Sequence, residues 1–538
     1  MKYRLLYILA LLFATLQTFA QSTVSYEYDA NNRLTKVTYS SGAVVTYTYD
    51  ELGNRLSKKV VGSAPNPNIH FYDQAVKAIC VENWDTNGDG ELSYDEAAAV
   101  TDLGGAFTNN DGILSFNELQ YFTGLTTIGE NAFNGCLSLA SVMIPDGVTT
   151  IGDNAFLNCY AFKTITLPDG LKSIGAEVFC YCYNIVKIEL PNGLESIGDG
   201  AFQNCSFTSL YIPSSVSSIG GYLLGSCNYL TSITVDPANE TYDSRNNCNA
   251  IIETATNTLV AGCKNTVMPD DLKAIGDGAF YGNSLHVSTL TIPESVTSIG
   301  DRAFIYNSQI QNIVFPANLE HVGWDAFYNT GWFKKQPDGM VYINQIAYKY
   351  KGTMSQNSSV EFDEGTKMIS PYFFDYAAGR NVTSISIPKS VKYIGHNAFD
   401  QCGNLTSVTV YAKTPPALDS RYRIFPYNFS LDKKTLYVPY GTKAKYENAN
   451  EWKRFKNIVE MEQQSYIEGD ANGDGKVTVT DIAVVVNQIL QLPNTDYSSY
   501  GADANGDGSV TVTDIGVIVD IILGNGANAR KGDALEPQ

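Results

Sequence analysis

The stretch TTIGENAFNGC at residues 126–136 returns as TTIGDNAFLNC at 149–159, KSIGAEVFCYC at 172–182 and ESIGDGAFQNC at 195–205. The isoleucine of this pattern therefore recurs every 23 residues. A second apolar segment that ends in proline, such as LASVMIPDGV at 139–148, separates successive copies. A unit this short cannot bury its apolar side chains alone, so the units must stack and share one continuous core. The sequence predicts a solenoid of short parallel strands.

The same phase returns at Ile275, Ile299, Val322 and Ile394, and residues 124–440 hold about fourteen such coils. Two segments, 247–263 and 339–352, alternate like hairpins, and we expect them to widen single coils. The elements IGxxAFxxC and LxxIxLP resemble the BspA-like family of leucine-rich repeat surface proteins. This resemblance implies a leucine-rich repeat solenoid that binds a host or bacterial surface protein or glycan.

Cysteines occur once per coil, after the phenylalanine. The members of this ladder are Cys136, Cys159, Cys182, Cys205, Cys227 and Cys402, and Asn283 and Asn307 occupy the same place in other coils. Alternation of Cys with Asn predicts a side chain directed at backbone groups inside the coil, and hence free thiols. Cys248 and Cys263 are the exception. They would face each other in a hairpin that turns at 255–256, which makes a disulfide between them geometrically allowed.

Two near-copies of a calcium loop, separated by 33 residues, stand near the C-terminus. The ligand positions of the first are Asp470, Asn472, Asp474, Lys476 (backbone), Thr478 and Asp481, and those of the second are Asp503, Asn505, Asp507, Ser509 (backbone), Thr511 and Asp514. A predicted helix follows each loop, at 481–490 and 514–523, and neither loop has a convincing entering helix.

This arrangement at 466–524 resembles a dockerin module, which implies Ca²⁺-coupled folding and a cohesin-type partner. The resemblance places the partner contact at Val479 and Thr480 and, equivalently, at Val512 and Thr513. Identical pairs would permit two binding orientations. The alternative is a calcium-stabilised cap without a partner.

A third loop follows a predicted helix at 71–84 and has EF-hand spacing. Its ligands would be Asp85, Asn87, Asp89, Glu91 (backbone), Ser93 and Glu96. A weaker loop at 107–118 has Glu118 at its last position but Phe107 where the first carboxylate is needed. We expect it to be a metal-free partner of the first, and the pair to cap the solenoid.

The N-terminus adds two further segments. Residues 1–20 have the basic start and short apolar run of a cleaved signal peptide, which predicts an exported protein at the cell surface, secreted or in the periplasm. YEYDANNRLTKV from Tyr26 and YTYDELGNRLSKKV from Tyr47 predict short antiparallel strands and resemble the YD repeats of Rhs-type proteins.

The predicted organisation is multidomain, with a small β segment, an α EF-hand cap, the solenoid and an all-α dockerin-like module. Its boundaries are 1–20 signal peptide, 21–62 YD-like β segment, 63–123 EF-hand module, 124–462 solenoid with C-terminal cap, 463–524 dockerin-like module and 525–538 tail.

Charge and motifs limit the functional classes. The formal net charge of −20 argues against binding nucleic acid or anionic membranes, and no later apolar run is long enough to insert into a membrane. The predicted sheet face is rich in Ser and Thr. Lys187, Glu189 and Tyr211 form the charged and aromatic cluster on this face, and they are the candidate ligand contacts. No catalytic motif is present. A non-catalytic binding protein is therefore favoured, with a subunit of a polysaccharide-degrading assembly as the alternative.

Overall fold

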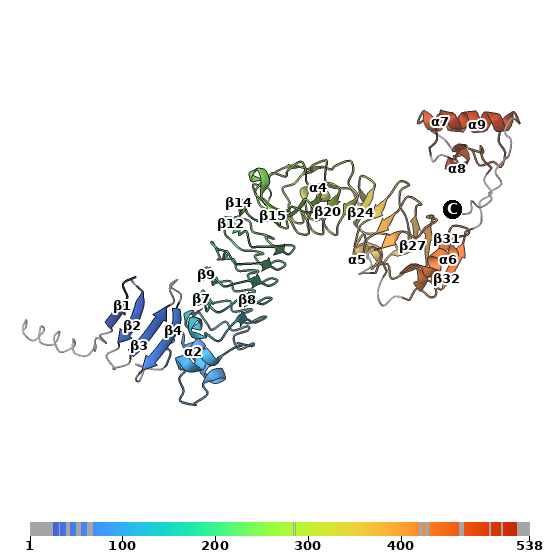
Figure 1. Cartoon of the computed structure of the whole chain (residues 1–538). Helices are drawn as coiled ribbons and strands as arrows, with labels where there is room; N and C mark the ends of the chain where they lie inside the picture. Colours follow the sequence, from blue (N-terminus) through green and yellow to red (C-terminus); the bar gives the residue numbers. More distant parts are fainter. Residues whose placement is uncertain are drawn as a thin grey trace, which may run out of the picture.

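The structure is a computed structural model that describes residues 25–31, 33–38, 44–49, 55–61, 68–282, 285, 287–418, 423–425, 430–461, 467–493, 497–506 and 509–524. The predicted signal peptide and tail lie outside these residues, as do Asn283 and Asp507. Figure 1 shows a small N-terminal sheet, a long curved solenoid and a C-terminal helical module. Within the described part of the chain, no helix has the length and apolar character needed to cross a membrane.

The N-terminal segment forms a four-stranded antiparallel meander. Its strands are β1 (Ser25–Tyr28), β2 (Leu34–Thr38), β3 (Val44–Tyr49) and β4 (Arg55–Val61), in that spatial order. Asp29 closes the first turn by accepting from the backbone N–H of Arg33 and pairing with its guanidinium at 2.6 Å. The YD motif thus supplies the turn chemistry of the hairpin.

A helical cap begins the solenoid. It comprises α2 (Gln74–Trp84), α3 (Tyr94–Ala99), β5 (Ser115–Phe116) and the 3₁₀ helix η1 (Asn117–Tyr121). Phe107 is fully buried and stacks on Phe133 with ring centroids 5.3 Å apart, and β5 pairs in parallel with the strand of the next coil. The segment 107–118 is therefore built as a solenoid coil, and the aromatic ring at its first position faces the core.

The coils contribute short strands to two faces of the solenoid, and most of these strands pair in parallel. One face begins with β6 (Thr127–Ile128), β8 (Thr150–Ile151), β10 (Ser173–Ile174), β11 (Ser196–Ile197) and β13 (Ser218–Ile219). It continues with β15 (Tyr242–Asp243), β16 (Ala250–Glu253), β17 (Thr258–Gly262), β18 (Ala274–Ile275), β20 (Ser298–Ile299) and β22 (His321–Val322). It ends with β23 (Gly339–Ile343), β24 (Ile346–Lys351), β26 (Met368–Ile369), β28 (Tyr393–Ile394) and β30 (Ala417–Leu418).

The other face is made of β5 with β7 (Ser141–Met143) and β9 (Thr164–Thr166), then β12 (Ser209–Ile212) with β14 (Ser232–Val235), and β19 (Thr289–Thr291) with β21 (Asn312–Val314). Its last sheet is β25 (Ser358–Glu361), β27 (Val382–Ile387), β29 (Ser407–Val410), β31 (Thr435–Val438) and β32 (Asn457–Glu460). Equivalent residues pair, as Ile151 does with Ile174. About 14 turns of about 23 residues confirm the predicted fold class.

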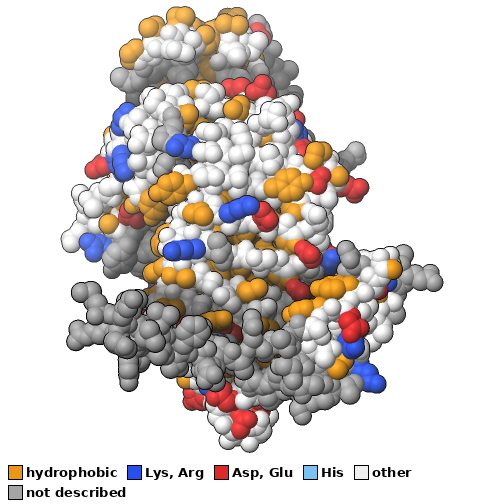
Figure 2. Space-filling view, turned by 90° about the vertical axis from the view of Figure 1, so that its left-hand side faces the viewer, with side chains coloured by type: hydrophobic (Ala, Val, Ile, Leu, Met, Phe, Trp, Pro, Cys, Tyr) orange, Lys and Arg blue, Asp and Glu red, His pale blue; other side chains and the backbone are white. Residues whose placement is uncertain are grey.

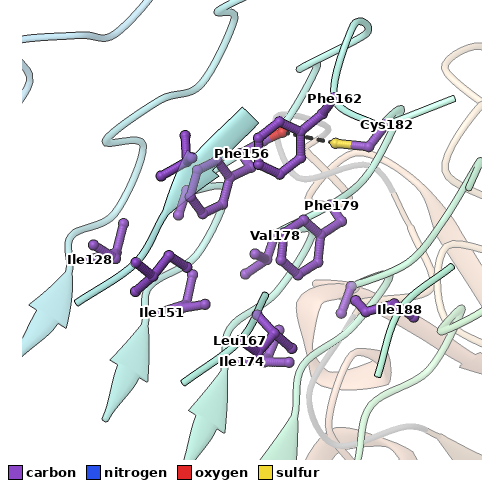
Figure 3. Packing of buried hydrophobic residues seen from close by; sticks show 14 of the residues in the cluster. Ile128, Ile151, Phe156, Phe162, Leu167, Ile174, Val178, Phe179, Cys182 and Ile188 are labelled. Atoms are coloured by element: carbon purple, nitrogen blue, oxygen red, sulfur yellow. Dashed lines mark hydrogen bonds between the residues drawn. The ribbon is translucent and has the colours of Figure 1, made fainter. Parts of the chain in front are cut away.

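Phenylalanine stacks run through the core. Phe156 lies between Phe133 and Phe179 with ring centroids 5.2 and 5.6 Å away and planes within 8° of parallel. Figure 3 shows the rings of Phe156 and Phe179 beside the row Ile128, Ile151 and Ile174. The coils approach so closely that a Cβ added at Gly198 would lie 2.5 Å from the backbone nitrogen of Ala176. Gly198 of its IG pair is therefore required by the close stacking of the coils.

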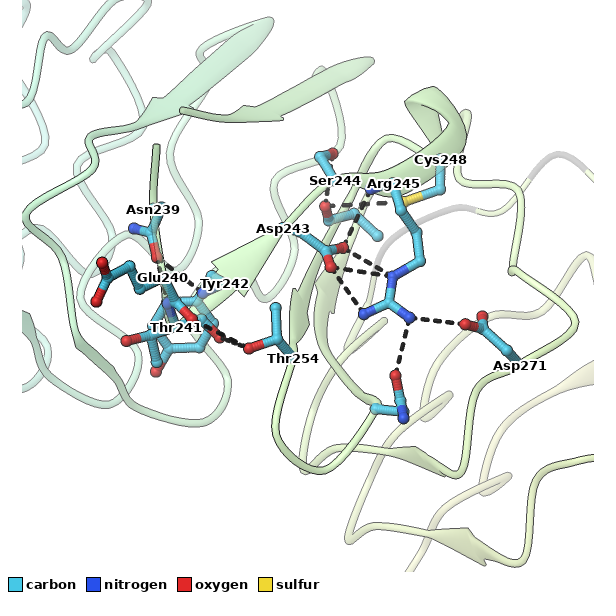
Figure 4. A network of polar contacts seen from close by, with 12 residues as sticks. Asn239, Glu240, Thr241, Tyr242, Asp243, Ser244, Arg245, Cys248, Thr254 and Asp271 are labelled. Carbon is cyan, nitrogen blue, oxygen red and sulfur yellow. Dashed lines mark hydrogen bonds and ion pairs between the residues drawn. The ribbon is translucent and has the colours of Figure 1, made fainter. Parts of the chain in front are cut away.

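The two predicted hairpins are β16–β17 and β23–β24. They do more than widen coils, because each packs a core on both of its faces: Ile251 joins the core of the N-terminal coils and Ile252 that of the middle coils. The short helix η2 (Arg245–Asn247) precedes the first hairpin. Arg245 there binds Asp243, Asn257 and Asp271 (Figure 4). Three further short helices lie in the later coils, α4 (Gly331–Lys335), α5 (Tyr376–Gly379) and α6 (Lys443–Asn448), and η3 (Trp452–Arg454) completes the C-terminal cap.

The C-terminal module has a core of its own. Helices α7 (Val479–Ile489) and α9 (Val512–Ile522) pack together through Val485 and Ile518, with α8 (Ser499–Ala502) beside them. Each long helix starts two residues before the predicted start, because Thr478 and Thr511 form capping boxes with the aspartates three residues later.

Candidate functional site

The first terminal loop is folded around its carboxylates. Asp470 is 5% exposed and accepts hydrogen bonds from the backbone N–H groups of Asp474 (3.1 Å) and Gly475 (2.8 Å). Gly475 has a φ of +83°, the conformation that this turn needs. Asp481 is fully buried and accepts from the N–H groups of Asn472 (3.0 Å) and Thr478 (2.8 Å). The two carboxylates thus fix both ends of the loop.

The second terminal loop repeats this geometry. Asp514 is fully buried and accepts from the N–H groups of Asn505 (3.1 Å) and Thr511 (2.8 Å). Asp503 occupies the place of Asp470, Ser509 that of Lys476, and Asp507 lies outside the described residues. The loop–helix unit is therefore duplicated in structure as well as in sequence.

The loop near the N-terminus has the same turn. Asp85 accepts from the N–H groups of Gly88 and Gly90 at 2.7 and 2.8 Å, and Glu96 accepts from those of Thr86 and Ser93. The N–H of Ser93 and further hydrogen bonds lower the pKa of Glu96 to about 2. The other predicted ligands serve the turn: Asn87 and Asp89 accept from the N–H groups two residues later, Glu91 pairs with Lys77, and Ser93 caps α3.

The three loops offer oxygen donors of the kind that Ca²⁺ prefers. Asp470, Asp481 and Asp514 are buried carboxylates, and none of the ion pairs formed by the described residues involves them. Buried anionic groups of this kind fit a divalent cation. In the described part of the chain, however, no three His, Cys, Asp or Glu side chains converge on one metal position. The ligand assignments therefore stay predictions.

The predicted partner contacts are exposed at the starts of the two helices. Val479 and Val512 are both 69% exposed. Thr480 and Thr513 bond to the side-chain amides of Asn472 and Asn505 at 3.1 and 3.0 Å. Each pair is thus tied to its own loop by an equivalent contact, and an exposed valine stands at the start of each helix.

The predicted ligand face of the solenoid is interrupted. Residues 186–190 form no strand, so the sheet breaks between β9 and β12. At the break Lys187 and Glu189 form an exposed ion pair at 2.5 Å beside a depression of about 450 Å³. Tyr211, one coil further, donates instead to Asp236 at 2.7 Å. Figure 2, which views the side on which these strands lie, shows charged and hydrophobic side chains scattered over a surface that is otherwise white.

The ladder cysteines are buried free thiols, and those from Cys136 to Cys227 donate to carbonyls of the preceding coil. Cys136, Cys159 and Cys182 donate to the carbonyls of Phe107, Phe133 and Phe156 at 2.9 to 3.2 Å. Asn307 donates in the same way to Phe280 at 2.7 Å. One contact thus explains why Cys and Asn alternate.

The allowed disulfide between Cys248 and Cys263 is not formed, and both are free thiols. A bulge between Ile251 and Ile252 shifts the hairpin register by one residue, so Ala250 pairs with Gly262. Cys248 then packs in the core of the middle coils and Cys263 in that of the N-terminal coils. The two thiols consequently lie on opposite faces of the hairpin.

A family model for the BspA type leucine-rich repeat region matches six copies at 106–231, 250–351 and 335–420, which is more than half of the chain. The chain belongs to the BspA-type leucine-rich repeat family. Two further family models match, the dockerin type I domain at 468–523 and the RHS repeat at 16–44 and 28–62. These matches confirm the three predicted resemblances, whereas the EF-hand at 85–96 stays a prediction. None of the three models describes a catalytic domain.

Solved structures similar to this BspA-type chain come from bacteria. A leucine-rich cell surface protein of Faecalibacterium prausnitzii is 22% identical, with 71% of this chain and 96% of that chain covered and a TM-score of 0.39. The pneumococcal vaccine antigen PcpA is 17% identical, with 80% and 99% covered and a TM-score of 0.41. A leucine-rich repeat protein of Bacteroides ovatus is 17% identical, with 82% and 88% covered and a TM-score of 0.28. No curated protein matches the chain.

Sequence reasoning missed two groupings that the BspA-type coils create. His321 and His396 are far apart in sequence but close enough to interact; burial lowers the pKa of His321, and His396 lowers it further. Several tyrosines also gather where neighbouring coils turn. Both groupings could have been found by comparing residues at the same position of different coils rather than residues that are close in sequence.

Proposed function

We propose that this protein is an exported, non-catalytic binding protein. Its solenoid recognises a protein or glycan of a host or bacterial surface, and its C-terminal module anchors it to a cohesin-type partner. The duplicated pair Val479–Thr480 and Val512–Thr513 carries the proposal, because both valines are equally exposed at equivalent helix starts.

Calcium belongs to this proposal. The predicted oxygen ligands of both terminal loops, and of the loop at 85–96, would hold one ion each, and the bound cation would neutralise the buried carboxylates. Asp470 and Asp481 already hold the backbone turn at which α7 starts. Loss of the cation would leave these carboxylates buried and repelling each other, so docking should require calcium.

The docking test is a pull-down from surface extracts of the source organism, with the partner then identified, using the mature chain with and without a chelator. Replacing only Val479 and Thr480 with alanine should leave capture largely intact, since the second pair presents the same surface. Replacing both pairs should abolish it. Leu492→Ala, 50% exposed between the two halves, is the matched control.

Capture of the same cohesin-type protein by the double-pair variant, or no capture in calcium, would reject docking. The alternative, a non-catalytic subunit of a polysaccharide-degrading assembly, differs in what is captured. It requires polysaccharide-degrading enzymes to be bound to the same partner.

Two further parts of the proposal have direct tests. Cleavage of the signal peptide would leave Gln21 as the first residue of the exported protein, which N-terminal sequencing reads. Lys187, Glu189 and Tyr211 are proposed ligand contacts beside the break in the sheet. Replacing all three with alanine should weaken ligand binding without changing cohesin capture.

A further inference from the structure

Tyrosines gather where the coils turn after their buried phenylalanine. The ring centroid of Tyr183 lies 5.5 Å from that of Tyr160 and 5.8 Å from that of Tyr181. Further along, the ring of Tyr281 lies 5.8 Å from Tyr306 and 5.9 Å from Tyr222. We call these six residues the tyrosine stripe: Tyr160, Tyr181, Tyr183, Tyr222, Tyr281 and Tyr306.

Backbone hydrogen bonds join the two halves of the tyrosine stripe. The N–H of Tyr181 donates to Gln203 and that of Asn204 to Gly225; the N–H of Ser226 then donates to Tyr281 at 2.6 Å. The coils between the two groups of rings therefore present Asn204 and Ser226, which are small and polar. Asn204 and Ser226 thus lie at this position between Tyr181 and the second group of rings, and Tyr222 belongs to the same coil as Ser226.

Four of the six rings are exposed to solvent, and those of Tyr222 and Tyr281 are half-buried. Tyr160, Tyr181, Tyr183 and Tyr306 are 38% to 51% exposed. Burial and neighbouring groups raise the pKa of Tyr181 and Tyr183 above that of an ordinary tyrosine, so both rings are neutral over the physiological range. The stripe thus offers neutral aromatic faces together with hydroxyl and amide groups.

The backbone beneath three of these rings is unfavourable for tyrosine. Tyr181, Tyr222 and Tyr306 have φ values of +62°, +57° and +66°. Other coils place small or amide residues at the position of Tyr181 and Tyr306: Gly135, Asn158, Asn204, Ser226, Gly282 and Asn329. Asn and Gly tolerate left-handed backbone and a bulky residue does not. Tyrosine at these places is therefore a cost to folding, and strain of this kind clusters at functional sites.

We propose that the tyrosine stripe binds a neutral glycan chain, with its rings stacked on the C–H faces of successive sugars. Neutral rings and uncharged hydrogen-bonding groups match a sugar, which has apolar faces and hydroxyl edges. The nearby charges are mainly acidic, Glu177, Asp277 and Asp301 against Arg302, and the chain carries a net charge of −20. An anionic glycan would therefore be repelled. This inference rests on the proposed function only in taking the solenoid as the ligand-binding part.

The test is a double variant, Tyr181→Asn with Tyr306→Asn, in the full mature chain. Asparagine suits the left-handed backbone, so the melting temperature should rise by about 1–3 °C. Binding to neutral polysaccharides should fall at least about tenfold, because two stacking platforms are lost. The probes are soluble β-mannan, xyloglucan, β-1,3-glucan and dextran, with polygalacturonate as the anionic counterpart, measured by affinity electrophoresis. Tyr440→Asn, 61% exposed beside β31, is the control.

A melting temperature that falls would show that the rings are packing elements and would overturn the inference. Equal retardation of the double variant and the wild-type protein by the neutral polysaccharides would also overturn the inference. Retardation by polygalacturonate alone, or capture only of surface proteins, would assign the stripe to another class of partner. Cohesin capture should be unchanged in this variant, so failure of the glycan inference and failure of docking are separable.

Discussion

Replacing Cys159 with alanine tests the hydrogen-bond ladder inside the coils. The thiol is fully buried and donates to the carbonyl of Phe133 at 3.1 Å. Alanine removes that hydrogen bond, worth about 1 kcal/mol, and leaves a small cavity where the sulfur was. The expected loss in free energy of unfolding is about 1–3 kcal/mol, or a decrease of about 2–6 °C in melting temperature.

The assay compares thermal melts of Cys159→Ala and Cys159→Ser, followed by circular dichroism. Serine keeps a donor at the same place, as Asn307 does in its own coil, so it should lose less than half as much stability as alanine. Burial raises the pKa of the Cys159 thiol, so it should also resist alkylation at pH 8 until the protein unfolds. Equal losses for the two variants, or no loss for alanine, would refute the reasoning.

Three further predictions follow from particular contacts. Calorimetric titration should count three calcium sites, and Asp470→Ala should remove one; a count of one or none would reject the ligand assignments. Phe179→Ala should cost about 3–5 kcal/mol in chemical unfolding, because its ring stacks between Phe156 and Phe202, and a loss below about 1 kcal/mol would contradict that packing. Asp73 caps α2; burial opposes its ionisation, but N–H groups of Leu114, Ser115, Ala75 and Val76 outweigh it and hold its pKa below the usual value. Asp73→Ala should cost about 1 kcal/mol near neutral pH. Asp73 stabilises the fold above its unfolded pKa of about 3.9 and loses this effect as the pH falls, so the two melting temperatures should converge in acid; a constant difference would contradict the cap.

The repeating part of the fold could be predicted from the sequence because each sequence repeat of a solenoid corresponds to one coil. Ile151 pairs with Ile174 only because each coil has the same length as the next. The Cys and Asn alternation likewise predicted a side chain beside backbone groups, and Cys182 contacts one. Where every coil repeats a contact, a single sequence contains many independent observations of it.

The features that the sequence did not predict depend on local departures from the regular coil, which the repeat pattern does not encode. The bulge at Ile251 moves Cys248 and Cys263 to opposite faces of the hairpin, and no residue in this segment indicates a bulge. The sequence indicates a metal-free loop at 107–118 that pairs with the loop at 85–96, whereas the burial of Phe107 makes this segment a coil of the solenoid. The break in the sheet at 186–190 is also invisible in the pattern, since those residues alternate as their neighbours do.

The placement of the predicted calcium loops separates two roles for the ion. Leu92 of the loop at 85–96 shares one core with Ile69, Phe71 and the first coils. An ion bound there would stabilise the N-terminal end of the solenoid. The terminal loops enclose a different core, formed by Ala471, Val485, Ala502, Ala504 and Ile518, which among the described residues shares no member with the solenoid cores. Calcium in these loops would order the docking helices without changing the solenoid. Docking and ligand recognition would then depend on separately folded parts of one chain, so loss of either would leave the other intact.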